Sequence, residues 1–222
     1  MGNRALIATE KRDIGIYLHW NGGRDTVEPL LRYCELQGYR APSEDSYGWA
    51  RLAQVMGNFF GGSTSIGLEA LGGRLSDPGD NSVYIIEGWR IKEHLRQEFD
   101  QESDEERWVP FPEEWEQRGH PFDEMLRELD QSMPKDLQLG GFLDAPEVPT
   151  EEIEVGDEVY VSALDQGYEL HKVVGVGADV VVNGIHAKGV PYVGKYVRGG
   201  DPSRNPNNYL TRPSYRVRRE RQ

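Results

Sequence analysis

The chain has 222 residues, with 38 acidic and 25 basic side chains and a formal net charge of −13. This length is enough to bury a hydrophobic core in one large domain or in two small ones. The negative charge disfavours direct binding to nucleic acid or to an anionic membrane, and it favours a basic protein partner.

Cysteine usage and hydropathy indicate a cytoplasmic protein. Cys34 is the only cysteine, which excludes an intrachain disulfide and a cysteine-based zinc site. It lies beside Leu30 and Leu31 on the apolar stripe of an expected helix, so we predict core packing rather than nucleophilic chemistry. No apolar run reaches the roughly 18 residues of a membrane span, and the first apolar stretch is too short for a secretory signal. The scattered histidines and the glycine-rich stretches fit no metal-site or phosphate-loop pattern, so we expect neither metal nor cofactor.

The first 95 residues predict a compact α+β domain. Residues 4–10 and 14–20 form two short strands joined by a polar turn, which is typical of a hairpin. A helix follows, with Asp25 as N-cap, Glu28 at the capping-box spacing and Gly38 at its end.

A second helix and a returning strand complete this domain. Residues 46–60 carry a wide apolar stripe at helical spacing, and residues 82–86 have the composition of a strand. The stretch GGSTSIG, residues 61–67, follows a helix and has no lysine, so we interpret it as a turn and a new helix N-cap.

Residues 96–140 form an acidic segment with interleaved aromatic residues. Between residues 93 and 130 there are 14 acidic side chains and 4 arginines, a net charge of −10. The tryptophans and phenylalanines among the acids predict short packed helices rather than a disordered tail.

The C-terminal part predicts a small β-rich domain. A linker is expected at residues 140–152, followed by four strand-like runs, EVYVSAL, LHKVVGV, DVVVNG and VPYVGKYV, within residues 150–200. Such runs favour a small SH3-like β-barrel. Asn183-Gly184 is typical of a type I′ turn. Residues 201–222 form a basic tail rich in arginine.

The acidic segment is the first candidate binding site. A strong local charge costs folding stability, and carboxylates with aromatic anchors between them can occupy a groove that normally holds nucleic acid. Generic solubility is the alternative. The candidate partner-binding residues are Glu102, Asp104, Glu105, Glu106, Trp108, Glu113, Glu114 and Trp115.

The exit of the second strand is the other candidate site. Tyr17, His19, Trp20 and Asn21 form a possible ligand lip where a strand meets a turn. The alternative is a tryptophan that closes the core beside a surface histidine. We identify no catalytic residue, although His19 could act as a base with Asn21 or Asp25 as helper.

Several N-terminal motifs carry a resemblance to a known group of proteins. They are Met1-Gly2-Asn3-Arg4, the stretch GIYLHWNGG at residues 15–23, YGWARL at residues 47–52 and NFFGG at residues 58–62. This region, roughly the first 95 residues, resembles an uncharacterised family of phage and mobile-element proteins of bacteria. The resemblance implies a small accessory protein in the host cytoplasm. Proteins of that kind often neutralise host defence, as anti-CRISPR proteins do, and many are acidic.

Three functions therefore compete. The first is a non-enzymatic protein-binding factor that inhibits a host defence complex by presenting an acidic surface that mimics nucleic acid. Its partner would be a basic host protein, such as a nucleic-acid-processing complex. The second is a hydrolase with its site around His19. The third is a nucleic-acid-binding module formed by the C-terminal β domain and the arginine tail.

Overall fold

The computed structural model describes residues 2–61, 65–100, 104–162, 168–177, 179–185, 191–197 and 214–218. The chain divides into two compact units, Met1–Gln138 and Leu139–Gln222. Helices and sheets occur together, so the predicted mixed α+β class is confirmed. Among the described residues, no helix combines the length and the apolar character needed to cross a membrane.

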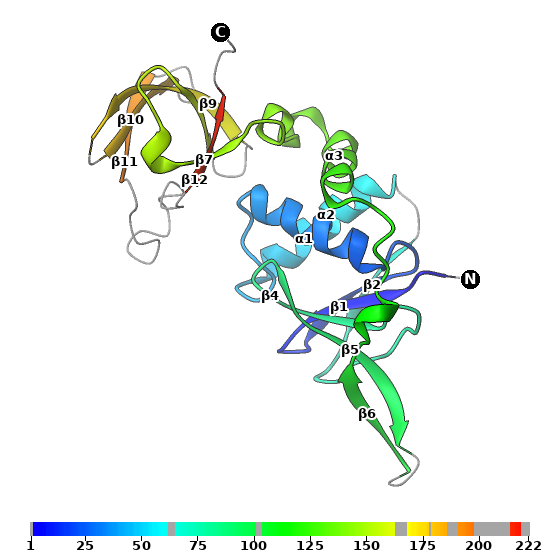
Figure 1. The fold of residues 1–222 in the computed structure, drawn as a ribbon. Helices are drawn as coiled ribbons and strands as arrows, with labels where there is room; N and C mark the ends of the chain where they lie inside the picture. The colour runs from blue at the N-terminus through cyan, green and yellow to red at the C-terminus, as the bar shows by residue number, and fades with distance from the viewer. Residues whose placement is uncertain are drawn as a thin grey trace. The chain divides into compact units, whose positions relative to one another are not determined.

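Unit 1 is built on a six-stranded sheet in the order β3-β2-β1-β4-β5-β6 (Figure 1). The β1–β4 pair is parallel and the other pairs are antiparallel. The predicted hairpin is β1 and β2, and the predicted returning strand is β4. The strands are β1 (Ala5–Thr9), β2 (Ile14–Leu18), β3 (Ile66–Ala70), β4 (Val83–Glu87), β5 (Arg90–Asp100) and β6 (Glu105–Pro110).

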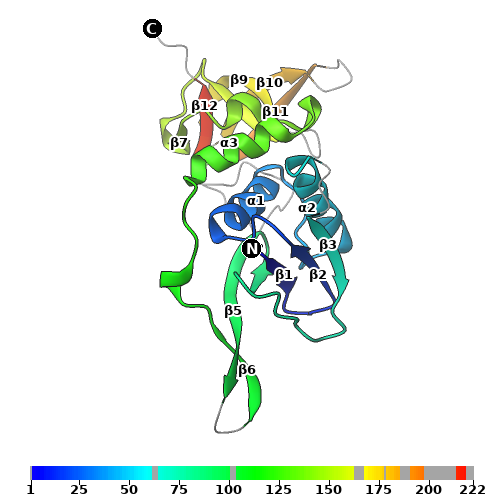
Figure 2. The same ribbon diagram turned by 90° about the vertical axis from the view of Figure 1, so that its right-hand side faces the viewer.

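The helices of unit 1 lie on one side of this sheet (Figure 2). Helices α1 (Arg24–Leu36) and α2 (Ser46–Phe59) lie against the sheet, and α3 (Phe122–Ser132) packs on both of them. The opposite side of the sheet has its own apolar cluster, with Leu6 and Val83 at its centre and Leu71 and Trp108 packed against it. All five residues of β1 are buried as a result.

The two large helices begin differently. Asp45 caps α2, and its carboxylate accepts a hydrogen bond from the Tyr47 backbone N–H at 2.9 Å. Helix α1 begins after Gly23, which supplies no side-chain cap, so the capping box predicted at Asp25 and Glu28 is wrong. Asp25 lies instead in the first turn of the helix, where a negative charge is favoured by the helix dipole.

Much of the acidic segment is a β-hairpin rather than helical. Strands β5 and β6 cover residues 90–100 and 105–110, and only α3 and the short 3-10 helix η1 (Glu113–Trp115) are helical in the part that follows, up to Ser132. The boundary predicted near residue 95 falls inside β5, and the acidic segment up to Gln138 belongs to unit 1. Similarly, residues 66–70 form strand β3 where we predicted the start of a helix. Strand β5 pairs with β4 and β6, its neighbours in sequence, whereas β3 pairs with β2, which is distant in sequence.

Unit 2 contains a second six-stranded sheet, in the order β11-β10-β9-β8-β12-β7. The four predicted strand runs correspond to β8 to β11, while β7 and β12 were not predicted. Asn183 and Gly184 pair with β11 inside β10, so the turn predicted there is wrong. The strands are β7 (Glu147–Pro149), β8 (Glu158–Ser162), β9 (Tyr168–Val176), β10 (Asp179–Ile185), β11 (Pro191–Val197) and β12 (Ser214–Arg218).

The core of unit 2 is a small cluster of aliphatic side chains. It comprises Ile153, Val159, Val173, Val180 and Val182. Besides η1, the described residues include the 3-10 helix η2 (Lys135–Leu137) at the end of unit 1. Unit 2 includes η3 (Gly140–Phe142) and η4 (Thr150–Glu152). The segment predicted as a linker therefore contains η3, β7 and η4.

Candidate functional site

The far end of the β5–β6 hairpin extends beyond the rest of unit 1 (Figures 1 and 2). We call residues 98–100 and 104–107 the acidic arm. Its register places Glu98 opposite Arg107 and Asp100 opposite Glu105 on one face of the hairpin. Phe99 lies opposite Glu106 on the other face, because neighbouring side chains in a strand alternate.

Two arginines neutralise part of the charge on the arm. Arg96 contacts Glu98 at 2.8 Å, and Arg107 contacts Glu98 at 3.3 Å and Asp100 at 3.4 Å. Hydrogen bonds from Arg96 and Arg107 lower the pKa of Glu98, so this carboxylate stays ionised. The other acids of the arm, Asp104, Glu105 and Glu106, are exposed to solvent.

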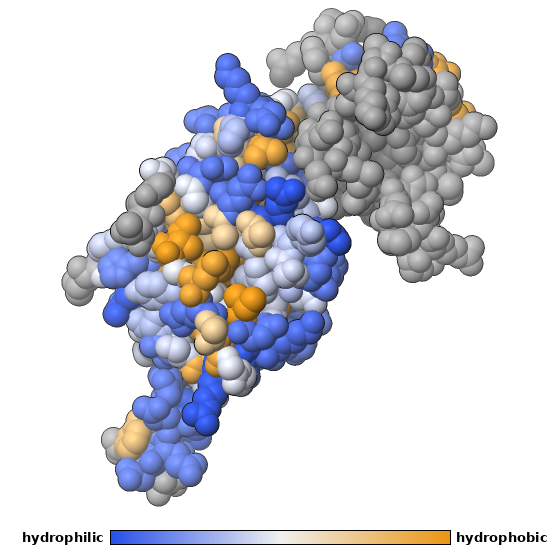
Figure 3. All heavy atoms as spheres, turned by 180° about the vertical axis from the view of Figure 1, so that it is seen from behind, coloured by the Kyte–Doolittle hydropathy of each residue, from blue (hydrophilic) through white to orange (hydrophobic). Residues whose placement is uncertain are grey.

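Four predicted carboxylates have no cationic partner within the described part of the chain. They are exposed, and they lie on the arm or on η1: Asp104, Glu105, Glu113 and Glu114. Glu106 is also exposed, and it accepts a hydrogen bond from Gln97. Glu102 was predicted with this group but lies outside the described residues. Seen from behind, the arm is mainly hydrophilic (Figure 3).

Arg96 brings η1 next to the arm. Its guanidinium lies over the ring of Trp115, 5.2 Å from the centroid, while it also pairs with Glu98. Trp115 is 58% exposed, and its ring centroid lies 6.1 Å from that of Phe111, with the two rings almost perpendicular. Arg96 therefore links Trp115 of η1 with Glu98 of the arm, both within the one acidic segment that we predicted.

The aromatic side chains divide into anchors and packing residues. Trp108 was predicted to bind a partner, but it is half-buried and packs against the apolar cluster under the sheet. Phe99, which we did not predict, is 55% exposed. Because Phe99 and Arg96 differ by an odd number of positions in β5, Phe99 and Trp115 flank the hairpin on opposite faces.

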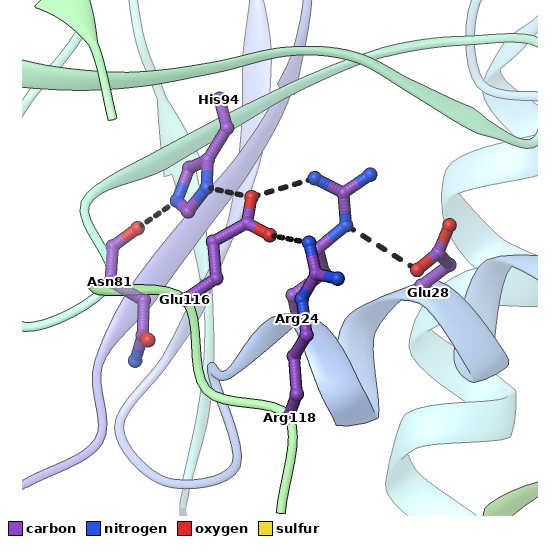
Figure 4. A network of polar contacts seen from close by, with 6 residues as sticks. All are labelled: Arg24, Glu28, Asn81, His94, Glu116 and Arg118. Carbon is purple, nitrogen blue, oxygen red and sulfur yellow. Dashed lines mark hydrogen bonds and ion pairs between the residues drawn. The ribbon is translucent and has the colours of Figure 1, made fainter. Parts of the chain in front are cut away.

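A buried ionic network holds the segment after η1 against α1 (Figure 4). The Glu116 side chain is 2% exposed and accepts hydrogen bonds from Arg24 Nη1 at 2.6 Å and Arg118 Nη2 at 2.9 Å. Burial alone would raise the pKa of Glu116, but the hydrogen bonds from both arginines hold it below its usual value. Glu116 is therefore a structural carboxylate, although the sequence places it in the acidic segment.

His94 extends the network into the sheet. Its Nδ1 atom lies 3.3 Å from Glu116, and its Nε2 atom lies 2.7 Å from the Asn81 carbonyl oxygen. The ring is stacked between Tyr84 and Phe111, with centroid distances of 4.0 Å on both sides. Burial lowers the pKa of His94, against hydrogen bonds to Asn81 and Glu116 that raise it.

The strand exit has a mainly structural geometry. Tyr17 Oη and His19 Nδ1 are 2.9 Å apart, and the His19 ring meets the edge of Trp20 at 4.9 Å. Asn21 adopts a left-handed backbone conformation with φ of 56°, which asparagine tolerates better than most residues. Gly22 follows, and its N–H donates to the Asn3 carbonyl oxygen at 2.8 Å.

The helpers proposed for His19 are not arranged around it. Asp25 accepts hydrogen bonds from the backbone N–H groups of Gly119 at 2.8 Å and His120 at 3.1 Å. This carboxylate therefore joins α1 to the segment before α3. The observed partner of His19 is a tyrosine hydroxyl, which does not activate an imidazole as a carboxylate would.

A pocket of about 350 Å³ lies beside the ionic network. Its lining combines two arginines and two carboxylates with an apolar ring: Arg24, Asp25, Glu28, Arg118, His120 and Phe122. The opposite charges balance, and Arg24 and Arg118 are already paired with Glu116. This lining gives the pocket no marked preference for an anion or a cation.

Two further predictions concern cysteine and metals. Cys34 is fully buried, which confirms its place in the core, and burial raises the pKa of its thiol. Among the described residues there is no group of three or more potential metal ligands.

Of the tail arginines, Arg216 and Arg218 lie in β12, and Arg212, Arg219 and Arg221 lie outside the described residues.

The acidic arm and η1 thus carry most of the predicted partner-binding side chains in exposed positions, and the strand exit brings Tyr17, His19 and Trp20 together at the surface. Comparison with known proteins assigns neither site a function, because no family model, curated protein or solved structure matches the chain.

Proposed function

We propose that the protein is a non-enzymatic binding factor that inserts its acidic arm into the basic groove of a partner protein. The carboxylates would stand in for nucleic-acid phosphates, and Phe99 and Trp115 would be the apolar anchors. The partner class is a nucleic-acid-processing protein. In the setting of a phage or mobile element, this binding would inhibit a host defence complex in the bacterial cytoplasm.

One observation carries this proposal. The arm projects from unit 1 (Figure 1). Phe99 is 55% exposed and lies opposite the exposed Glu106 on one face, and Glu98, Asp100 and Glu105 lie on the other face. An arm of this kind can enter a groove that a flat surface cannot reach. An exposed apolar ring on an acidic hairpin is expected where a partner supplies the opposite charge and covers the ring.

Charge reversal on the arm and on η1 tests the proposal. The arm variant combines Glu105→Lys on the arm with Glu113→Lys and Glu114→Lys on η1. The matched control combines Glu124→Lys, Glu128→Lys and Asp136→Lys, which are exposed acids elsewhere in unit 1. Both triple variants change the net charge from −13 to −7, because each replaces three negative charges with three positive ones.

The variants are compared by affinity capture from a bacterial lysate. We expect the unchanged protein and the control to retain the same basic protein, and the arm variant to lose it. Duplex DNA should displace the retained protein, and binding should fall steeply between low and moderate salt. Equal retention by the arm variant, or retention that DNA does not affect, would contradict the proposal.

We also propose that the strands of unit 2 close into a small SH3-like barrel. The antiparallel pairs from β8 to β11 and the aliphatic core under them support this arrangement. In a closed barrel the outer strands β7 and β11 pair with each other. Amide hydrogen exchange tests the barrel. The backbone N–H groups of β11 that face away from β10 should be protected from exchange in a closed barrel and unprotected in an open sheet.

A further inference from the structure

The two edges of the unit 1 sheet differ in character. Strand β6 forms one edge and carries Glu105, Glu106 and Arg107, charges that discourage pairing with another chain. Strand β3 forms the other edge, and within the described residues no strand lies beyond it. Its sequence, IGLEA, contains neither lysine nor proline, and Leu68 is 68% exposed.

The hydrogen bonds between β2 and β3 fix which backbone groups of β3 face outward. His19 N–H donates to Ser65 O at 2.8 Å, and Leu71 N–H donates to Asp13 O at 2.9 Å. In an antiparallel pair, hydrogen-bonded positions alternate with non-bonded ones. The odd-numbered residues of β3 therefore bond to β2, and Ile66, Leu68 and Ala70 direct their N–H and C=O groups away from the sheet.

The same three residues present an apolar row. Ile66, Leu68 and Ala70 lie opposite Leu18, Ile16 and Ile14 of β2, respectively, so they continue a hydrophobic face of the sheet. Hydrophobic residues also reach the surface of the body of unit 1 (Figure 3). Outward backbone groups with apolar side chains between them are the features that a further strand needs to join a sheet edge.

The row is self-complementary. If two β3 strands run antiparallel about a two-fold axis at Leu68, Ile66 of one copy lies opposite Ala70 of the other. Leu68 then lies opposite its own copy. All three outward residues form hydrogen-bonded pairs in this register, and both copies use the same patch, as a two-fold dimer requires.

The charge distribution favours this pairing over others. The acidic arm lies at the opposite edge, five strand positions from β3 in the sheet order. At a strand spacing of about 4.8 Å this is roughly 24 Å, well beyond the Debye length of about 8 Å in physiological salt. Joining two β3 edges keeps the two arms at the outer ends of the combined sheet, where their repulsion is weakest.

We propose that β3 is the contact strand of a symmetric homodimer centred on Leu68. The dimer displays two acidic arms, so a target with two basic grooves would be bound bivalently. Dimerisation uses no residue of the arm, and it can therefore be tested apart from the proposed function.

Sedimentation of the full chain across a range of concentrations measures the dimer. Leu68→Lys places two ammonium groups against each other at the axis, and we expect the dissociation constant to rise at least tenfold. Because Leu68 is exposed, the variant should keep the circular dichroism spectrum of the parent, and it should keep the urea midpoint at a protein concentration where both proteins are monomeric. Phe99→Lys, at a comparably exposed residue of the arm, is the control and should leave the dimer intact.

Disulfide trapping tests the register. Leu68→Cys places two thiols across a hydrogen-bonded pair with Cα atoms about 5.5 Å apart, within the range for a disulfide. Glu69→Cys is offset from its own copy and should not cross-link. Cys34 is buried and should not contribute. A chain that stays monomeric, a dimer that Leu68→Lys does not weaken, or equal cross-linking by both cysteine variants would overturn the homodimer.

Discussion

Arg24 and Glu116 are 92 residues apart in the chain, and Arg24 Nη1 lies 2.6 Å from Glu116 Oε1. This contact ties the segment after η1 to the first turn of α1. Asp25, the next residue, makes a second tie through the backbone N–H groups of Gly119 and His120. The segment that follows η1 is thus held at the first turn of α1 by an arginine and by a carboxylate.

Replacing Glu116 with glutamine should destabilise unit 1. The change removes one buried charge and its ion pairs with Arg24 and Arg118, and Arg24 keeps its contact with Glu28 at 3.4 Å. Breaking a buried ion pair costs about 3–5 kcal/mol. We expect roughly 2–3 kcal/mol here, because Arg24 and Arg118 keep some access to water. Urea unfolding measures the difference. Glu113→Gln, at an exposed neighbour, should stay within about 0.5 kcal/mol of the parent; equal losses would contradict a structural role for Glu116.

Gly22 should not tolerate a side chain. A Cβ atom there would lie 2.6 Å from the Asn3 carbonyl oxygen and 2.7 Å from the Ala5 Cβ atom. We expect Gly22→Ala to lower the unfolding free energy by about 2 kcal/mol or more, because backbone must move to relieve the overlap. Thermal and urea unfolding check this result.

Gly57→Ala is the matched control. Gly57 lies inside α2, and a Cβ atom would meet nothing within 4 Å. Alanine is favoured over glycine in a helix interior by about 1 kcal/mol. The control should therefore be slightly stabilised. The same substitution should thus have opposite effects at the two positions, and similar effects would argue against the close approach at Gly22.

Stability should decrease on acidification. The pKa of His94 is below its usual value of about 6.5, because burial disfavours the imidazolium. Between the folded and unfolded pKa values the unfolded chain binds more protons, so unfolding becomes easier as pH falls below about 6.5. Glu116, whose pKa is also lowered, adds a further loss below about pH 4.5.

Urea midpoints at about pH 7.5, 6.5 and 5.5 measure this dependence. His94→Phe keeps an aromatic ring between Tyr84 and Phe111 but cannot titrate. We expect the slope between pH 6.5 and 5.5 to flatten in this variant. His120→Phe changes an exposed histidine and should retain the slope. A steep slope that survives in His94→Phe would assign the acid sensitivity to another group.

Helix α2 could be predicted because its signals are local. Asp45 caps it, and Trp49, Leu52 and Met56 form the buried stripe that the spacing indicates. The start of α1 could not be predicted in the same way. The Asp25 carboxylate has the spacing of a cap, but it bonds to residues 119 and 120, which only the folded chain brings near.

The acidic arm was missed for a different reason. Its charge could be counted from the sequence, but Phe99 is the one apolar residue among its paired positions, so the hairpin between β5 and β6 shows no apolar alternation there. Phe99 could have been found from the alternation in β5 once that strand was known. The burial of Glu116 carried no local signal, because its partner Arg24 precedes it by 92 positions.

Truncating Phe99 should leave the free energy of unfolding almost unchanged, whereas truncating Trp108 should lower it. Phe99 is exposed on the arm, so Phe99→Ala should leave the urea midpoint within about 0.5 kcal/mol of the parent. Trp108 packs against the apolar cluster of the sheet, and Trp108→Ala should cost about 2–3 kcal/mol, less than a fully buried tryptophan. In partner capture, Phe99→Ala should weaken retention about tenfold or more, as the loss of a central anchor does. If Phe99→Ala retains the partner fully, the ring is not an anchor, and binding would rest on the carboxylates and Trp115 alone.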